Sequence, residues 1–240
     1  MLATQKLGGI TGRGTSVRRF VADNSLSLVF FGLFLISLAG QAVAGYFEFN
    51  DHQTQHEEPT MSFGRYVVSS NFGADMLENW QSEWLQFWTF ALATVWLIQK
   101  GSNESKKPED VGTETDEQQR VGEYALQNSP RWAKVKDWRL SIYSNSFFLV
   151  MGVIFLATWI AQSFASWTVY NNEQNAHDDP GLSWLSYLGS ANFWERSLQN
   201  WQSEFLAVGT MAVFTIYLRQ RGSAESKPVG APHEETGSSG

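Results

Sequence analysis

The sequence contains no cysteine. This absence excludes a disulfide framework, a cysteine-ligated zinc site and a thiol nucleophile. Proline is scarce, with 6 among 240 residues, and none of the six lies inside a long apolar run. The sequence therefore gives no sign of the broken membrane helices that many transporters use. Within the long apolar runs, charged residues occur only at the outer ends.

The mean hydropathy is slightly negative, at -0.25, because the apolar residues are gathered into runs rather than spread evenly. There are four such runs, at residues 26–49, 80–98, 147–170 and 201–218. Each is close to the roughly 20 residues that cross a bilayer as a helix. Buried helices of a soluble protein are the alternative, but these seldom run so far without an interior charge. We therefore predict an all-α membrane protein with four transmembrane helices.

The two halves of the chain are related by a constant offset. Aligning residues 24–106 with 145–227 needs no gap and makes about 34 of 83 positions identical. Each repeat holds two predicted transmembrane helices, so the copies should be parallel and related by an axis along the membrane normal. The first run could be a signal peptide, since four cations precede it. Its counterpart lies in mid-chain, however, which favours a retained helix.

Three segments lie outside the repeats. Residues 1–23 are predicted to be a cytoplasmic N-terminal segment. The linker at 107–144 begins with a charged, turn-rich stretch that should be mobile. Within it, residues 130–139 mix cations with tryptophan, which is typical of a helix lying on an anionic membrane surface, although a solvated connector is the alternative. Residues 228–240 are predicted to be a disordered tail.

Lysine and arginine are unevenly distributed over the predicted loops. Of 17 such residues, 4 precede the first apolar run, 8 lie between the second and third, and 3 follow the fourth. The other two loops hold only Arg65 and Arg196. The positive-inside rule then makes both termini and the linker cytoplasmic. The net charge of -7 leaves the outer loops acidic and gives no support to nucleic-acid binding.

The most strongly repeated motif is Asn-Trp-Gln-Ser-Glu, which occurs at residues 79–83 and again at 200–204. Counting about 20 residues along each helix, at about 1.5 Å per residue, places both glutamates about 6 Å beneath the outer membrane surface. The same counting brings one glutamine of each repeat to this depth. The predicted polar intramembrane site consists of Gln41, Asn79, Glu83, Gln162, Asn200 and Glu204.

The glutamates of this site have two interpretations. In the first, each carboxylate snorkels to the interface, caps the start of its helix and accepts a hydrogen bond from a neighbouring Gln or Trp. In the second, Glu83 and Glu204 face one another and share a proton or bind a cation. Either way, we expect Gln41 and Gln162 to point into the bundle near the Glu of their own repeat.

The outer loops carry a second repeated element, a histidine followed by two acids and a proline. Imidazole and carboxylate groups are ligands for zinc, manganese or iron, so the weak metal candidates are His56, Glu57, His177 and Asp178. A solvated turn is the alternative, because no close histidine pair is present, and the cofactor stays unknown. Short interfacial helices and aromatic anchors are expected at the membrane surfaces, the anchors being Trp80, Trp132, Trp138 and Trp201.

These motifs carry a resemblance. The repeated pentapeptides, together with the closing pattern Gln-Lys/Arg-Gly-Ser-x-Glu-Ser-Lys at 99–106 and 220–227, are similar to an uncharacterised bacterial membrane-protein family classed as a domain of unknown function. The resemblance covers both repeats. It implies a multi-pass protein of the bacterial inner membrane with four crossings, and it transfers no catalytic residue.

Three classes of function follow from the sequence. The first is a non-catalytic membrane module that binds lipid or a partner, either a second copy of the chain or another membrane protein. The second is a small channel or a proton- or cation-coupled transporter that uses the paired glutamates. The third is a membrane metalloenzyme. We rank the first class ahead, because the sequence holds no recognised catalytic motif and four helices are few for a transport path.

Overall fold

The computed structural model describes residues 14–237, and within this range it is all-helical, as the sequence predicts. Its α-helices are α1 (Gly14–Asp23), α2 (Ser25–Gln55), α3 (Phe63–Tyr66), α4 (Ser70–Trp96), α5 (Trp138–Ser144), α6 (Ser146–Ala176), α7 (Trp184–Leu188) and α8 (Ala191–Tyr217). Three single turns of 3-10 helix lie in the linker, namely η1 (Pro108–Asp110), η2 (Gly122–Tyr124) and η3 (Arg131–Lys134). The chain forms two compact units, Met1–Phe72 and Gly73–Gly240. Residues 1–13 of the predicted N-terminal segment and residues 238–240 lie outside the described residues.

The first unit consists of α1, α2 and α3 with the loop that joins α2 to α3. Asn50 fixes this loop with both ends of its side-chain amide, since Nδ2 donates to the Met61 carbonyl at 3.0 Å and Oδ1 accepts from the Met61 amide at 2.9 Å. The loop turns at Glu57, whose φ of +57° lies in the left-handed region. Tyr66 of α3 is buried, and its hydroxyl lies directly against Gly45 of α2. A side chain at Gly45 would displace that ring.

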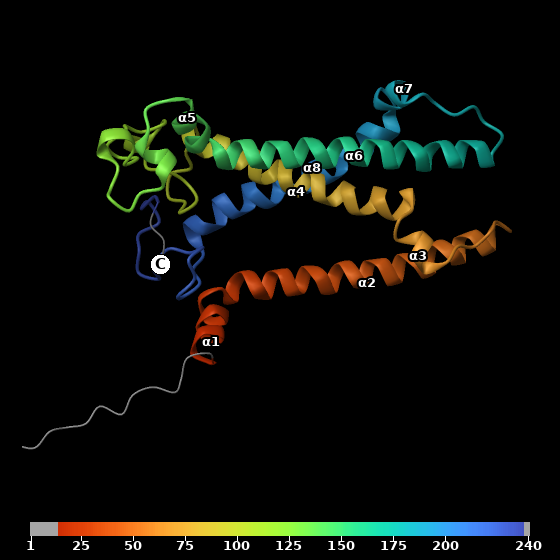
Figure 1. Ribbon diagram of the computed structural model, residues 1–240, viewed down its shortest axis with the longest axis horizontal. Helices are drawn as coiled ribbons and strands as arrows, with labels where there is room; N and C mark the ends of the chain where they lie inside the picture. Colours follow the sequence, from red (N-terminus) through yellow and green to blue (C-terminus); the bar gives the residue numbers. More distant parts are fainter. Residues whose placement is uncertain (1–13, 238–240) are drawn as a thin grey trace, which may run out of the picture. The chain divides into compact units, whose positions relative to one another are not determined.

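In the second unit, the long helix α6 packs against α4 and α8 (Figure 1). The indole of Trp88 on α4 lies over Gly152 and stacks on Phe155 of α6. On the α8 side, Trp159 stacks on Phe193 with ring centroids 5.7 Å apart. The glycine and the flat rings allow close helix packing, which is how helices associate where the surroundings are themselves apolar.

Corresponding elements of the two repeats have equal lengths. Helices α2 and α6 both contain 31 residues, and α4 and α8 both contain 27. The asparagine contact also recurs, because Asn171 holds both the carbonyl and the amide of Leu182 at 2.9 and 2.8 Å. The aromatic contact recurs in altered form. Tyr187 occupies the place of Tyr66, but its counterpart of Gly45 is a serine, Ser166, which hydrogen-bonds the phenol instead of leaving room for it.

Two of the described helices, α2 and α6, are long and apolar enough to cross a membrane. Their apolar side chains are for the most part exposed. The sequence predicted four crossings, and α4 and α8 do not reach the same hydropathy. The reason is that the segments predicted to cross begin with the polar pentapeptides and contain further polar residues such as Gln86 and Thr210.

The motif that closes each repeat folds into a compact loop, which we name the first closing loop (residues 99–106) and the second closing loop (residues 220–227). In the first, Ser105 Oγ accepts from the Gln99 amide at 2.9 Å and donates to the Lys106 carbonyl at 3.0 Å. In the second, Ser226 makes the same two contacts. Helices α4 and α8 end before these loops, at Trp96 and Tyr217, and Gly101 and Gly222 supply the positive φ that the loops require.

The expectation of a disordered tail is wrong for residues 228–237. Lys227 is 1% exposed, and its ammonium group contacts four backbone carbonyls, those of Gly101, Pro232, His233 and Glu235, at 2.6 to 3.1 Å. Thr236 accepts a hydrogen bond from the Gly101 amide at 2.8 Å. Residues 228–237 are therefore ordered, because they provide the oxygen ligands of a buried lysine.

The linker also differs from its prediction. A single helix was expected over residues 130–139, but the structure has the 3-10 turn η3 followed by the separate helix α5. The break occurs at Asp137, which adopts an extended conformation and accepts from the Arg139 amide at 3.0 Å as the N-cap of α5. The capping carboxylate starts a new helix where the mixture of cations and tryptophan had suggested a continuous one.

Candidate functional site

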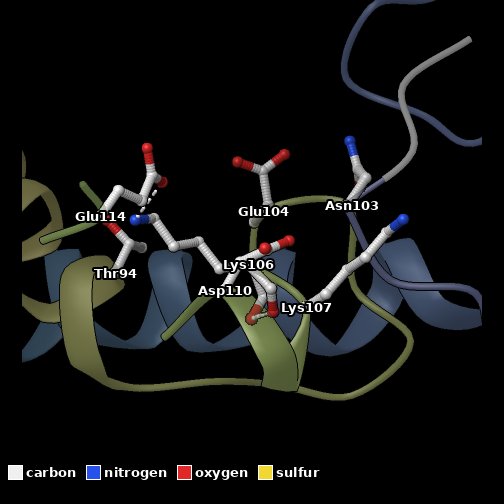
Figure 2. A pocket seen from close by; sticks show the side chains of 9 residues that line it. Thr94, Asn103, Glu104, Lys106, Lys107, Asp110 and Glu114 are labelled. Carbon is white, nitrogen blue, oxygen red and sulfur yellow. Dashed lines mark hydrogen bonds and ion pairs between the residues drawn. The ribbon is translucent and has the colours of Figure 1, made fainter. Parts of the chain in front are cut away.

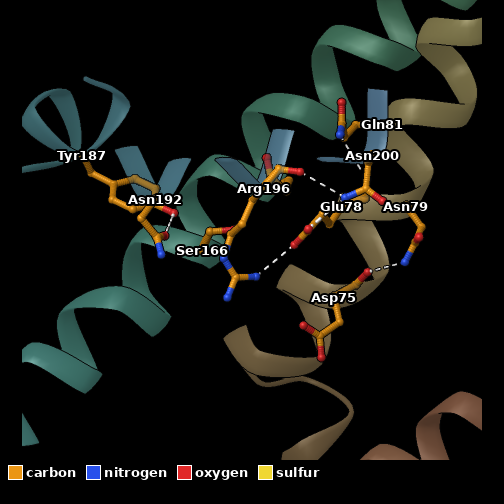
Figure 3. Close-up of polar contacts among 10 residues, drawn as sticks. Asp75, Glu78, Asn79, Gln81, Ser166, Tyr187, Asn192, Arg196 and Asn200 are labelled. Atoms are coloured by element: carbon orange, nitrogen blue, oxygen red, sulfur yellow. Dashed lines mark hydrogen bonds and ion pairs between the residues drawn. The ribbon is translucent and has the colours of Figure 1, made fainter. Parts of the chain in front are cut away.

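Helices α4 and α8 are joined by a line of polar contacts, which we call the polar seam. At one end, Arg196 forms an ion pair of 2.9 Å with Glu78, and Asn200 donates to the other oxygen of the same carboxylate, also at 2.9 Å (Figure 3). The Glu78 side chain is only 14% exposed. Because both of its oxygens are occupied by donors, the buried charge is compensated, as a stable ion pair in a low dielectric requires.

The seam continues through the two copies of the pentapeptide. The Trp201 indole donates to Gln81 Oε1 at 2.8 Å, and Gln81 is fully buried. The Ser82 hydroxyl lies 3.3 Å from Glu204 Oε1 and 2.9 Å from the Asn79 carbonyl of its own helix, so its single proton serves one of these two acceptors. The motif thus meets its own second copy across α4 and α8.

Glu83 and Glu204 are close enough for their charges to interact. Glu83 is exposed, whereas Glu204 is half-buried. The two pseudo-equivalent carboxylates therefore have different environments. Of the two, Glu204 has a protein hydrogen-bond donor within reach, namely Ser82.

Helix α6 contributes a second polar group to the same unit. Gln162 is fully buried and donates from Nε2 to Ser166 at 3.0 Å, while its Oε1 is buried without a partner among the described residues. The Tyr187 hydroxyl donates to Asn192 Oδ1 at 3.0 Å, and burial raises the pKa of this phenol above its ordinary value of 10.0. Figure 3 shows Tyr187 and Ser166 on the side of Arg196 that faces away from α4.

The structure brings only part of the predicted site together. Asn200 and Glu204 contact α4, whereas Asn79 donates to the Asp75 carbonyl of its own helix. Gln162 is inward-facing but bonds to Ser166. Gln41 is exposed on α2, in the other unit. The expected contact between each Gln and the Glu of its own repeat thus stays a prediction for Gln41, and for Gln162 the described hydrogen bond goes elsewhere.

Four residues of the seam were not singled out from the sequence, namely Glu78, Gln81, Ser82 and Arg196. Gln81 and Ser82 belong to the repeated motif, so the repeat contained a signal for them. Arg196 also had a signal, because it is one of only two cations in the predicted outer loops. In the structure Arg196 lies on α8, and its partner is the largely buried carboxylate of Glu78.

The four predicted anchors fall into different settings. Trp132 and Trp138 are exposed and pack edge to face with centroids 6.4 Å apart. Trp80 is half-buried on α4. Trp201 is half-buried and packs against Trp159 while it bonds to Gln81, so it participates in helix packing.

The two repeated histidine elements, which the sequence predicts to lie in outer loops, form turns. The His56 ring stacks on His52 with centroids 4.2 Å apart, and its Nδ1 lies 2.9 Å from the His52 carbonyl. His177 makes the equivalent contact with the Glu173 carbonyl at 3.2 Å. Glu57 and Asp178 have φ values of +57° and +59° and turn the chain. Within residues 14–237, no group of three or more His, Cys, Asp or Glu is arranged to hold a metal ion.

A pocket of about 470 Å³ lies over the first closing loop, at the other end of α4 from the seam (Figure 2). Its lining combines carboxylates, lysines and neutral polar groups, and includes Thr94, Asn103, Glu104, Lys106, Lys107, Asp110 and Glu114. Figure 2 shows Lys106 reaching toward Glu114, with which it forms an ion pair of 2.7 Å. The hydrogen bond from Lys106 holds the pKa of Glu114 below its ordinary value of 4.5.

Glu104 meets its pseudo-equivalent, Glu225, where the two closing loops touch. Burial, together with the charge and hydrogen bonding of Glu225, raises the pKa of Glu104 above its ordinary value of 4.5. The folded protein therefore holds this proton over a pH range in which the unfolded chain has lost it. Stability from this source is present at low pH and declines as the pH rises through the raised pKa.

We expect the unfolding temperature to fall as the pH is raised from about 4.5 through this range. Glu104→Gln should flatten that fall, because an amide can donate to Glu225 at every pH. The neighbouring variant Glu109→Gln, at an exposed position outside the pocket lining, serves as the control and should keep the wild-type slope. Thermal unfolding of the three purified proteins over a pH series measures the effect. A wild-type slope in Glu104→Gln would contradict the assignment.

The chain matches the model of a known family. The model of a family described as a domain of unknown function (DUF6766) matches residues 17–238, which include the polar seam and both closing loops. Comparisons with curated proteins and with solved structures give no match.

Proposed function

We propose, from the premise that the chain belongs to the DUF6766 family of unknown function, that it is a non-catalytic membrane protein that binds lipid. The observation that carries this proposal is the exposed apolar surface of α2 and α6, two helices of 31 residues each. Contiguous apolar patches larger than a few hundred Å² are rarely exposed on soluble monomers. A lipid bilayer would cover the apolar surface of both helices without a further protein.

The polar residues of the second unit support a binding role over catalysis. Glu78 forms an ion pair with Arg196 and accepts a hydrogen bond from Asn200, and Gln81 accepts one from Trp201. Groups that satisfy one another in this way stabilise a helix contact and leave no activated base or nucleophile. Mass spectrometry of the chain extracted from its membrane tests the proposal. Bound phospholipid at a defined stoichiometry supports it, and a lipid-free chain that stays folded in water contradicts it.

The finer architecture that we propose is a duplicated pair of hairpins with four crossings in a bacterial inner membrane. In this arrangement α4 and α8 also span, with their polar seam toward α6 and the outer surface. The equal helix lengths and the recurring asparagine contact support the duplication. The cation distribution supports cytoplasmic termini and a cytoplasmic linker.

The absence of native cysteine makes this topology directly testable. Single cysteines at Thr60 and Gly181, in the loops predicted to be outside, should react with a membrane-impermeant maleimide in intact cells. A cysteine at Gly112, in the linker, should react only after the cells are opened. Labelling of Gly112 in sealed cells, with protection of the other two positions, would reverse the orientation. Labelling of all three would remove the four-crossing arrangement.

A second candidate function is a proton or cation pathway through the seam. The specific observation that favours it is the approach of Glu83 and Glu204 across α4 and α8. If these carboxylates carry a proton or cation, the double variant Glu83→Gln and Glu204→Gln should abolish flux into vesicles while the protein remains folded. The response of the two single variants should be non-additive, because the sites interact. Equal flux in wild type and double variant would eliminate the pathway.

A further inference from the structure

The pocket over the first closing loop is rich in hydrogen-bond acceptors. The Thr94 hydroxyl donates to the Phe90 carbonyl at 2.9 Å, so its oxygen can offer the pocket only a lone pair. Asn103 Oδ1 is buried without a hydrogen-bond partner among the described residues. The carboxyl groups of Glu104 and Asp110 add further oxygen acceptors to the lining. A ligand that matches this lining must bring N–H or O–H donors.

The lining charges also favour a cationic group with an anion beside it. Lys106 is already used by Glu114 and by the Gly112 carbonyl. Its charge is therefore balanced within the protein. The remaining cation of the lining is Lys107, which extends away from Lys106 in Figure 2. The lining thus combines acidic oxygen atoms with the ammonium group of Lys107.

The second repeat lacks this pocket chemistry although its loop has the same fold. The counterparts of Asn103, Lys107 and Asp110 are Ala224, Pro228 and Ala231, by the constant offset between the repeats. The counterpart of Thr94 is Thr215, which is buried and lies 2.9 Å from the Ser102 hydroxyl. The two copies of the loop therefore share a scaffold, and only the first carries the polar side chains of Asn103, Lys107 and Asp110 at these positions. Side chains needed for the loop fold alone would be expected in both copies.

We propose that this pocket binds a phosphoethanolamine group, with its primary ammonium at Glu104 and Asp110 and its phosphate at Lys107. The volume of about 470 Å³ is ample for this group and lies within the range of roughly 300 to 1,000 Å³ typical of small-ligand sites. A primary ammonium has three N–H donors for the acceptors of the lining, whereas a quaternary ammonium has none. The assignment rests on the proposed function, because an aminophospholipid is the membrane source of this group.

The experiment uses the full chain purified in detergent and native mass spectrometry. The probes are short-chain phosphatidylethanolamine, phosphatidylcholine with the same chains, soluble glycerophosphoethanolamine, and magnesium chloride. Two variants are compared, Asp110→Ala and Glu109→Ala. Each variant removes one negative charge, and the two positions are adjacent in the sequence. Asp110 lines the pocket, whereas Glu109 does not belong to the lining. Thermal unfolding in the absence of probe confirms that both variants are folded.

We expect phosphatidylethanolamine to bind in preference to phosphatidylcholine. Asp110→Ala should weaken it on the order of tenfold, the effect of one charge-assisted hydrogen bond, and Glu109→Ala should leave it unchanged. If glycerophosphoethanolamine binds as tightly as the lipid, the site stands and its ligand is soluble. Equal binding of the two lipids, or equal behaviour of the two variants, overturns the proposal. So does magnesium binding that depends on Asp110 without any preference for ethanolamine. Lipid binding that persists unchanged in Asp110→Ala leaves the proposed function intact and removes this site alone.

Discussion

Replacing Lys227 with Met is expected to lower the free energy of unfolding by about 2 to 4 kcal/mol. The ammonium group is buried and contacts four carbonyl oxygens, including that of Gly101 in the other repeat. Removing a buried charge recovers its desolvation cost, which opposes the loss. The loss should dominate, because several carbonyls would be left without a donor and Met offers none of them a hydrogen bond.

Lys106 provides a matched control, since it occupies the equivalent position of the first repeat. Its side chain is 29% exposed, and its partners are Glu114 and the Gly112 carbonyl. Water can replace the lysine there, so Lys106→Met should cost below about 1 kcal/mol. Denaturant titration of the three proteins in detergent measures both changes. Equal losses for the two variants would show that burial of Lys227 is not what stabilises the loops.

Gly152→Ala should destabilise the chain by about 1 to 3 kcal/mol, although alanine is the better helix former. A Cβ at this position would lie 2.7 Å from Trp88 Nε1 and 3.0 Å from the adjacent ring carbon, Cε2. Trp88 cannot move away freely, because its ring also packs on Phe148 and Phe155. The added methyl group should therefore push α4 away from α6.

The control for this prediction is Gly209→Ala on α8. A Cβ there meets nothing within 4 Å, so the substitution should be neutral or should stabilise the helix by about 0.5 to 1 kcal/mol. The same titration applies, with tryptophan fluorescence as a second readout of the Trp88 environment. If both alanines have the same effect, α4 and α6 are not in the close contact described.

The sequence predicted the helical class, and the alignment of its two halves predicted two corresponding pairs of long helices. These features depend on local patterns and on the repeat, both of which are visible in one chain. The sequence predicted less well which polar groups are in contact. It did not predict, for example, that Glu78 pairs with Arg196. Counting residues along a helix gives the depth of a side chain along the axis, but it does not give the rotation of the helix about that axis.

The order of residues 228–237 was missed for a related reason. Their composition is polar and rich in Gly and Pro, which in isolation indicates disorder. Their carbonyl groups are held by a lysine that belongs to the preceding loop, and backbone acceptors leave no trace in residue type. A signal did exist, since Glu114-Thr115 and Glu235-Thr236 are related by the same offset as the repeats. These two matching pairs extend the alignment of the two repeats beyond Lys227.

The contact between Lys227 and Gly101 has a consequence for the order of biosynthesis. The two residues are 126 positions apart, and Thr236 bonds to the amide of Gly101 from 135 positions away. When Gly101 leaves the ribosome, neither partner has yet been translated. The first closing loop can therefore complete these contacts only after residues 227–236 have been translated. Completion of this contact is a late event in the formation of the second unit, because it requires nearly the whole chain.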